Sequence, residues 1–352
     1  MFQTLMEIIF DLKSRLKSSA TYLFLASLLF GLSTVISAED RAAQESLRQA
    51  AQLLSEQKFQ AARIVLEELV NAAPNSPPQA FYQLALCYVK QSDWKRAEEV
   101  LEKFLRLSPE NFSGLYLTGF VLFSSGRYQE SLRLMLTLIE RNPEHAATHK
   151  VAGLDQFMLD RPDLAETELK RSVELAPQDA EAHYYLGRIH FMRDNLTAAL
   201  ADFQKATELD PSSIKAQNHL GQTYEALVQY PAARSAYLKA IELEKHQGAK
   251  SEWPYFNLGS LSLRQGQPAE AEVFLRQALE RQPNWSEGKA KLGMALLALD
   301  RLPEALSCLE QAIQIDPKNA DARYQYARLL VKLGKQDEAE RHLELFQQQK
   351  KP

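Results

Sequence analysis

Apolar residues recur along most of the chain at the spacing of one face of a helix. Two such runs are Tyr82, Leu84, Ala85 and Tyr88, and Leu186, Gly187 and His190. Positions three or four residues apart share a helix face, so these runs predict amphipathic helices. Polar or glycine-containing breaks at residues 91–93, 124–126, 193–195 and 265–266 predict turns between them. The pattern indicates short helices connected in pairs.

Prolines recur with a period of 34 residues. The series is Pro74, Pro109, Pro143, Pro177, Pro211, Pro283 and Pro317. Its steps are 35, 34, 34, 34, 72 and 34 residues, and the step of 72 equals two periods plus four residues. We place the four extra residues near Gln-Gly-Ala-Lys at 247–250, with Lys245 where a proline is missing. A fixed period of this length indicates stacked repeats, with each proline ending the second helix of a unit.

Small residues occupy two positions of every repeat. We number the positions of each repeat from its first residue and call them slots. The eighth position, slot 8, holds Ala50, Ala85, Gly119, Gly153, Gly187, Gly221, Gly259, Gly293 and Ala327. Slot 20 holds Ala62, Ala97, Ser131, Ala165, Ala199, Ala233, Ala271, Ala305 and Ala339. A small side chain allows two helix axes to approach closely, so we expect these slots at the crossing point of each helix pair.

Several segments resemble the tetratricopeptide repeat family. They are Tyr-Leu-Gly at 185–187, Leu-Gly-Gln-Thr-Tyr at 220–224, Ala236-Tyr237 with Ala240, and Ala-Thr-Glu-Leu-Asp-Pro at 206–211. The resemblance extends from residue 43 to about 350, and it implies an all-α fold, a right-handed α-solenoid of about nine helical hairpins. The expected units start near 43, 78, 112, 146, 180, 214, 252, 286 and 320, within a repeat domain spanning 39–352.

Composition and charge narrow the range of functions. Hydrophobic residues make up 45% of the 352 residues, charged residues 24%, and the formal net charge is −4. There is no basic field for nucleic acid, so no nucleic-acid partner is expected. Cys87 and Cys308 lie far apart in the sequence, so we interpret both as packing residues with reduced thiols.

The N-terminal 38 residues have the pattern of an export signal. Lys13, Arg15 and Lys17 precede an uncharged stretch, 18–38, that ends in small residues. This order predicts a signal peptide, 1–38, cleaved after Ala38, and a periplasmic or secreted repeat domain. The alternative is an inner-membrane anchor, because 21 uncharged residues reach ~31 Å as a helix. Both interpretations leave the repeats outside the cytosol, and the second provides a membrane tether through residues 18–38.

The resemblance also implies a binding surface. In the family the first helix of each hairpin lines the concave side through slots 2, 5, 9, 12 and 13, which we term the first-helix face. The predicted partner-binding groove comprises Tyr82, Leu86, Tyr116, Phe120, Phe123, Leu154, Phe157, Tyr184 and Phe191. Later units present more polar side chains, among them Lys215, Asn218 and Gln222, together with Trp253. An apolar patch of this extent is typical of a groove for a protein or peptide ligand, although neighbouring units could instead bury part of it.

No constellation of catalytic residues is apparent. Phosphate-loop, His-Glu-x-x-His and Cys-x-x-Cys motifs are missing from the sequence. His183 and His190 lie seven residues apart on one helix face, which would suit a metal pair, but these slots are packing positions in the family. We therefore expect no catalytic, metal or cofactor site, and a non-enzymatic scaffold that binds a protein. The alternative is a tethered subunit that recruits an envelope assembly, secretion or glycan-export enzyme.

Overall fold

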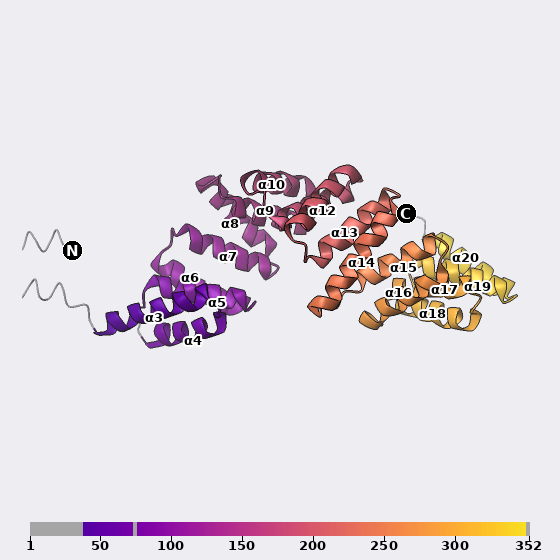
Figure 1. Cartoon of the computed structure of the whole chain (residues 1–352), viewed down its shortest axis with the longest axis horizontal. Helices are drawn as coiled ribbons and strands as arrows, with labels where there is room; N and C mark the ends of the chain where they lie inside the picture. Colours follow the sequence, from indigo (N-terminus) through magenta and orange to yellow (C-terminus); the bar gives the residue numbers. More distant parts are fainter. Residues whose placement is uncertain (1–37, 73–75, 350–352) are drawn as a thin grey trace, which may run out of the picture. The chain divides into compact units, whose positions relative to one another are not determined.

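The computed structural model describes residues 38–72 and 76–349, and every regular element in these residues is an α-helix. The chain divides into two compact units, Met1–Asn142 and Pro143–Pro352, which we describe separately. In each unit consecutive helices pair as antiparallel hairpins and every hairpin packs on the next (Figure 1). The all-α repeat architecture predicted from the sequence is confirmed.

The first unit contains three hairpins. Their helices are α3 (Ala38–Ser55), α4 (Phe59–Ala72), α5 (Pro78–Lys90), α6 (Trp94–Leu107), α7 (Phe112–Ser124) and α8 (Tyr128–Arg141). One apolar core joins them and includes Leu66, Leu84, Leu101 and Phe104. The signal peptide or anchor predicted at 1–38 lies outside the described residues, apart from Ala38, where α3 begins.

The second unit contains six hairpins. Their helices are α9 (Ala146–Met158), α10 (Pro162–Leu175), α11 (Ala180–Met192), α12 (Leu196–Leu209), α13 (Ile214–Ala226), α14 (Tyr230–Gln247), α15 (Trp253–Arg264), α16 (Pro268–Arg281), α17 (Ser286–Ala298), α18 (Leu302–Ile315), α19 (Ala320–Lys332) and α20 (Gln336–Gln349). From α5 onward, each first helix begins within one residue of its expected start. No described helix is both long and apolar enough to cross a membrane.

The small residues lie where the sequence pattern predicted. All eighteen side chains or glycines of slots 8 and 20 are buried. Slot 8 faces the residue sixteen positions later in the partner helix: a Cβ at Gly187 would lie 2.8 Å from the Phe203 ring, and one at Gly293 would lie 2.6 Å from Leu309 Cγ. Because Phe203 and Leu309 are fully buried, the missing Cβ sets how closely the two helices approach.

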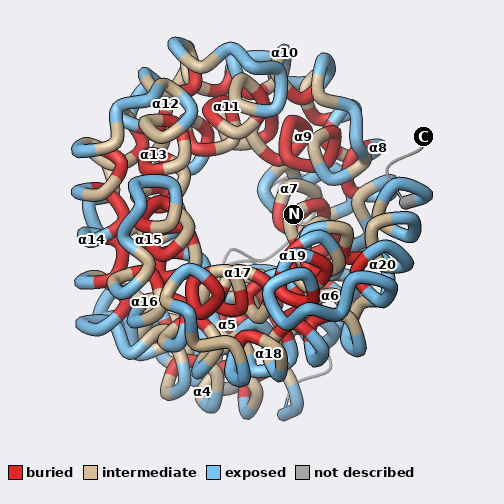
Figure 2. Tube along the Cα trace, turned by 90° about the vertical axis from the view of Figure 1, so that its right-hand side faces the viewer, coloured by how far each residue is buried: buried red, intermediate tan, exposed pale blue. Residues whose placement is uncertain are grey.

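First helices are more completely buried than second helices. In Figure 2, α11 and α17 are largely red or tan, whereas pale blue is more frequent on α12 and α16. A first helix contacts its own partner and also the helices of the adjoining hairpins, as α13 does with α12, α14 and α15. A large apolar side chain that stays exposed on a first helix, such as Met192, Trp253 or Tyr324, therefore departs from this general burial.

Each hairpin turns through one residue in the left-handed conformation. These residues are Gln57, Ser92, Gly126, Asp160, Asp194, Val228, Gly266, Asp300 and Gly334, with φ between 57° and 79°. The residue that follows caps the C-terminal end of the first helix. In α11, for example, the Asn195 N–H donates a hydrogen bond to the His190 carbonyl oxygen at 2.9 Å. Val228 is the strained member, because a β-branched side chain rarely adopts positive φ, and it is 66% exposed.

The four extra residues of the sixth repeat extend a helix. Helix α14 has 18 residues, against 14 in α12 and α16, and ends at Gly248 with a φ of 63°. The added turn buries Glu244, which accepts hydrogen bonds from Arg281 Nε at 2.8 Å and from Tyr255 Oη at 2.9 Å. Burial alone would raise the pKa of Glu244, but the bonds from Arg281 and Tyr255 hold it below its ordinary value. A buried, paired carboxylate thus occupies the joint where the proline is missing.

We predict that Gly187→Ala destabilises the protein. Alanine favours a helix by about 1 kcal/mol over glycine, but overpacking against the rigid Phe203 ring costs about 1–3 kcal/mol. The matched control is Gly119→Ala, whose Cβ would meet the flexible end of the buried Met135 side chain, with Leu134 Cδ2 in ordinary contact at 3.5 Å. Thermal unfolding followed by circular dichroism should show a lower Tm for Gly187→Ala than for Gly119→Ala. Equal Tm values would contradict the role of slot 8 in helix approach.

Candidate functional site

The predicted groove residues of the first unit are all half-buried. Tyr82 and Leu86 lie on α5, and Tyr116, Phe120 and Phe123 lie on α7. Each of three rings has an aromatic neighbour: Tyr82 is 5.5 Å from Phe104, Phe120 is 6.4 Å from Trp94, and Phe123 is 5.7 Å from Tyr128. Tyr82, Leu86 and Phe120 also pack against the core of this unit. These side chains thus combine a packing role with a remaining accessible edge.

The predicted residues of the second unit differ in exposure. Leu154 is 3% exposed and belongs to the packed interior, so it does not line an open surface. Tyr184 is 5% exposed, with its ring 5.4 Å from His219 of the next first helix and 6.0 Å from Phe203. Phe157 and Phe191 are half-buried. The next hairpin covers Tyr184 because first helices of successive repeats lie side by side.

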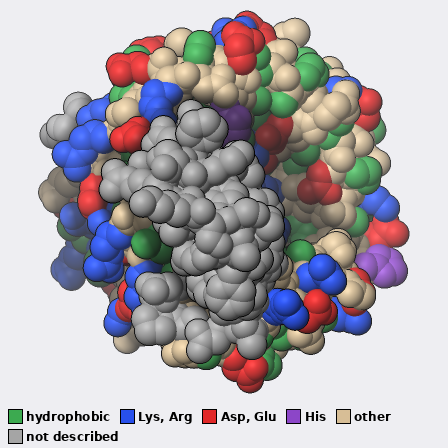
Figure 3. Space-filling view, turned by 90° about the vertical axis from the view of Figure 1, so that its left-hand side faces the viewer, with side chains coloured by type: hydrophobic (Ala, Val, Ile, Leu, Met, Phe, Trp, Pro, Cys, Tyr) green, Lys and Arg blue, Asp and Glu red, His purple; other side chains and the backbone are tan. Residues whose placement is uncertain are grey.

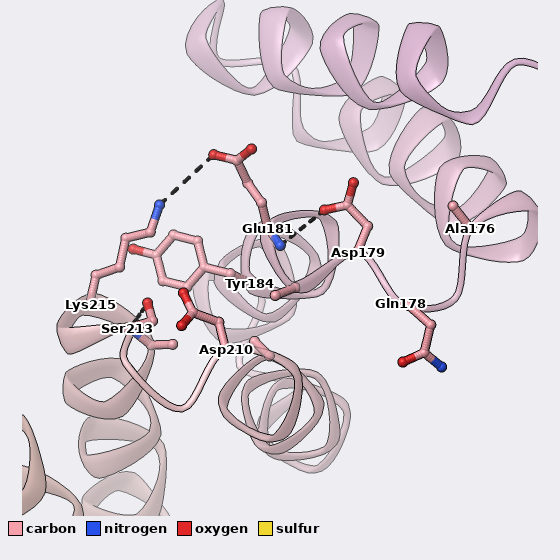
Figure 4. Close-up of a pocket in the computed structure, with 11 residues that line it drawn as sticks. Ala176, Gln178, Asp179, Glu181, Tyr184, Asp210, Ser213 and Lys215 are labelled. Atoms are coloured by element: carbon pink, nitrogen blue, oxygen red, sulfur yellow. Dashed lines mark hydrogen bonds and ion pairs between the residues drawn. The ribbon is translucent and has the colours of Figure 1, made fainter. Parts of the chain in front are cut away.

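Two adjoining cavities open on α11, α13 and the start of α15. The first, which we term the carboxylate cavity, has a volume of about 620 Å³ (Figure 4). It is lined by residues of the loops before α11 and α13 and of the first turns of these helices, within 176–181 and 210–216, together with Tyr184 and Ala206. The second, the tryptophan cavity, has a volume of about 400 Å³ and is lined by α13, Ser251 and Trp253. Lys215 lines both cavities, so they adjoin at this side chain, and we term the pair the recess.

Asp179, Glu181 and Asp210 give the carboxylate cavity its negative charge. Asp179 caps α11 through Oδ1, which accepts the N–H groups of Glu181 and Ala182, while its Oδ2 lies 2.8 Å from Lys150 Nζ. Glu181 reaches toward Lys215 across the recess, with 4.0 Å between Oε1 and Nζ (Figure 4). Asp210 Oδ1 accepts hydrogen bonds from the N–H and hydroxyl groups of Ser212. The lining residues thus carry three carboxylates and one ammonium group.

Cations lie against aromatic rings beside the carboxylate cavity. Arg188 is 4.6 Å from the centre of the Phe157 ring, and Lys215 is 4.6 Å from that of Tyr184. Such contacts hold the long stems of both cations along the aromatic surface while the charges remain in water. Phe157, one of the predicted groove residues, is therefore a support for Arg188.

Trp253 dominates the tryptophan cavity. Its side chain is 47% exposed, yet its ring lies 5.0 Å from Trp285 and 6.1 Å from Phe256, so it is held in place from behind. His219 forms part of the wall and donates from Nδ1 to the Lys215 carbonyl at 2.9 Å. A large, exposed and supported aromatic ring is typical of a binding hot spot.

His183 and His190 are packing residues that share a partner. Their Nδ1 atoms lie 3.1 Å and 2.8 Å from the two carboxylate oxygens of Asp202. Among the described residues, no group of three or more His, Cys, Asp or Glu side chains has an arrangement that could hold a metal ion. Cys87 is buried and Cys308 half-buried, and both are free thiols. Burial raises the pKa of Cys87 to about 11, which keeps this thiol protonated at neutral pH.

Sequence reasoning placed part of the recess on the first-helix face and missed the rest. Lys215, Gln222 and Trp253 occupy the expected slots, and they line the cavities. Asp179 and Asp210 lie in loops between repeats, outside those slots. Their one visible signal is an acidic residue at or near the N-cap of a predicted first helix. Over the face shown in Figure 3, Lys and Arg side chains lie beside Asp and Glu rather than in a separate basic field.

Comparisons with known proteins identify repeats of one kind along the chain. Family models described as tetratricopeptide repeat match residues 151–214, 212–284 and 296–350. A model for subunit 3 of the anaphase-promoting complex, or cyclosome, matches residues 55–138. Cell division cycle protein 27 homolog B of Arabidopsis thaliana is 40% identical over 77 residues, which is 22% of this chain and 10% of that protein. FK506-binding protein-like of Homo sapiens is 32% identical over 81 residues, 23% of each chain.

Solved structures share the fold at low identity. The APC/C hetero-tetramer Cut9-Hcn1 superimposes with a TM-score of 0.58 at 18% identity, covering 89% of this chain and 61% of that one. The structure of pilF from Pseudomonas aeruginosa gives a TM-score of 0.50 at 20% identity, covering 57% and 89%. The chain spans only 10% to 23% of the length of the curated relatives it matches.

We predict that His219 makes stability depend on pH. Burial lowers the pKa of His219, the Lys215 carbonyl opposes this, and the Arg188 and Lys215 charges lower it further. The unfolded chain therefore binds the proton first, and stability falls as pH drops through the ordinary value of 6.5. Between pH 7.5 and 5.5, the Tm of His219→Gln should fall less than that of the wild type. In the control His246→Gln, where the side chain is 76% exposed, the fall should match the wild type. Identical falls in all three proteins would refute the assignment.

Proposed function

Because the chain belongs to the tetratricopeptide repeat family, whose members bind protein or peptide partners, we propose that it is a non-enzymatic scaffold that captures a partner protein on its first-helix face. The observation that carries the proposal is the recess formed by the carboxylate and tryptophan cavities. There Trp253, at the start of a first helix that is otherwise well covered, remains 47% exposed and forms a wall of the tryptophan cavity.

The physical character of the recess supports protein binding rather than catalysis. Trp253 provides a rigid apolar surface, while Lys215 and the carboxylates provide polar contacts around it. This combination of an aromatic centre and a charged rim is the usual anatomy of a protein interface. Repeats occupy the described residues from α3 to α20, and the fold is generally non-enzymatic. We extend that property to this chain.

We further propose that the scaffold acts outside the cytosol. The support is the sequence of residues 1–38, where three basic residues, an uncharged stretch and small residues follow one another. The second candidate, a tethered subunit that recruits an envelope assembly, secretion or glycan-export enzyme, is favoured by the length of the uncharged stretch 18–38, ~31 Å as a helix.

In-cell photo-crosslinking tests the binding surface. A photoreactive residue replaces Trp253 or Lys215 in the recess, and Val273, a 53% exposed side chain on second helix α16, serves as the control. We expect a discrete protein adduct from positions 253 and 215 and none from 273. Adducts of equal yield from all three positions, or from 273 alone, would reject the first-helix face as the binding surface.

N-terminal sequencing of the protein from its host tests the location. We expect a mature chain that starts at Glu39 and is recovered without detergent from the compartment outside the cytosol. A chain that retains residues 18–38 and needs detergent for extraction would instead support the tethered subunit. Recovery of the intact chain from the cytosol would reject both.

A further inference from the structure

We propose that the recess selects a partner segment in which a large apolar side chain stands next to a lysine or arginine. The apolar side chain enters the tryptophan cavity and the cation enters the carboxylate cavity. This inference rests on the proposed function, since it names the chemistry of the segment that the scaffold binds.

The tryptophan cavity fits an apolar side chain. Trp253 forms one wall, Ile214 and the half-buried His219 contribute to the others, and the low pKa of His219 leaves its ring uncharged at neutral pH. The ring of Trp253 is held by Trp285, which is itself 7% exposed, so little conformational freedom is lost on binding. The volume of about 400 Å³ accommodates an aromatic or a large aliphatic side chain.

The carboxylate cavity complements a cation. Its lining carries the carboxylates of Asp179, Glu181 and Asp210 and the ammonium group of Lys215. Lys150, outside the lining, pairs with Asp179 at 2.8 Å, so one negative charge remains uncompensated. Among the described residues no cation forms an ion pair with Asp210. The Glu181 side chain is 46% exposed, and its carboxylate lies 3.5 Å from Lys150 Nζ and 4.0 Å from Lys215 Nζ. A lysine or arginine entering here would gain carboxylate partners, whereas an acidic side chain would be repelled.

The shared position of Lys215 fixes the spacing of the two side chains. Because this residue borders both cavities, the apolar residue and the cation of the partner must be close in sequence. In an extended segment, residues two apart point the same way, and in a helix residues three or four apart do so. We therefore expect two to four residue steps between the two anchors.

Selection from a random ten-residue peptide display library tests this chemistry on the processed protein isolated from its host. We expect enrichment of Trp, Phe, Leu or Met two to four positions from Lys or Arg. For a selected peptide labelled with a fluorophore, Trp253→Ala should weaken binding about tenfold or more. Trp253→Phe should retain most of the affinity, and Val273→Ala should retain all of it.

Charge reversal tests the second half of the motif. Asp210→Lys should weaken the peptide several-fold, and a variant peptide with Glu in place of the cation should recover affinity for Asp210→Lys. The matched control is Glu208→Lys, which makes the same change in net charge at a 69% exposed side chain outside both cavities. Circular dichroism confirms that each variant retains its helical content.

Three outcomes would overturn the inference: no enriched peptide, enrichment of acidic peptides, or selected peptides that bind Trp253→Ala as well as the wild type. The proposed scaffold function would survive any of these if crosslinking from positions 253 and 215 still captured a protein. Loss of both the peptide motif and the crosslinks would reject the binding surface itself.

Discussion

The close approach of two helices at a small residue is the interaction on which the rest of this protein depends. A slot-8 glycine or alanine lets the side chain sixteen positions later, such as Phe203 or Leu309, fill the space beside the helix backbone. The resulting hairpin has apolar surface left over, which it can bury only against the next hairpin. Stacking follows from this constraint, and stacking in turn decides which first-helix side chains remain accessible.

Much of this architecture could be read from the sequence because it depends on period and side-chain size. The prolines and small residues marked the repeat boundaries and helix crossings, and the structure places all eighteen small residues in the interior. The turns were less visible, since positive φ is obvious at Gly126 but not at Val228, where the surrounding fold imposes it. The sequence pattern placed the four extra residues near 247–250. Helix propensity alone did not show that they would lengthen α14 to 18 residues instead of forming a longer loop.

The candidate site was harder to predict because it depends on neighbours. Slot numbers place Tyr184 and Leu154 on the first-helix face, yet the adjoining helices cover both. Trp253 occupies an equivalent slot and remains 47% exposed at the start of α15, directly after the lengthened helix α14. Asp179 and Asp210 come from loops that approach the face only once the hairpins are stacked. A surface assembled from consecutive repeats is thus a tertiary property that the pattern of one repeat does not encode.

The lengthened helix α14 shows how such a chain can change length. Four residues correspond to about one helical turn, so the insertion carries the chain onward by one turn while almost restoring its rotational phase. The Glu244–Arg281–Tyr255 contacts then anchor the added turn to the following hairpin. Insertions of one or two residues at the same joint would rotate every later hairpin out of register. Length variation inside a continuous helix such as α14 should accordingly come in whole turns, because only whole turns keep the following hairpin packed in the same register.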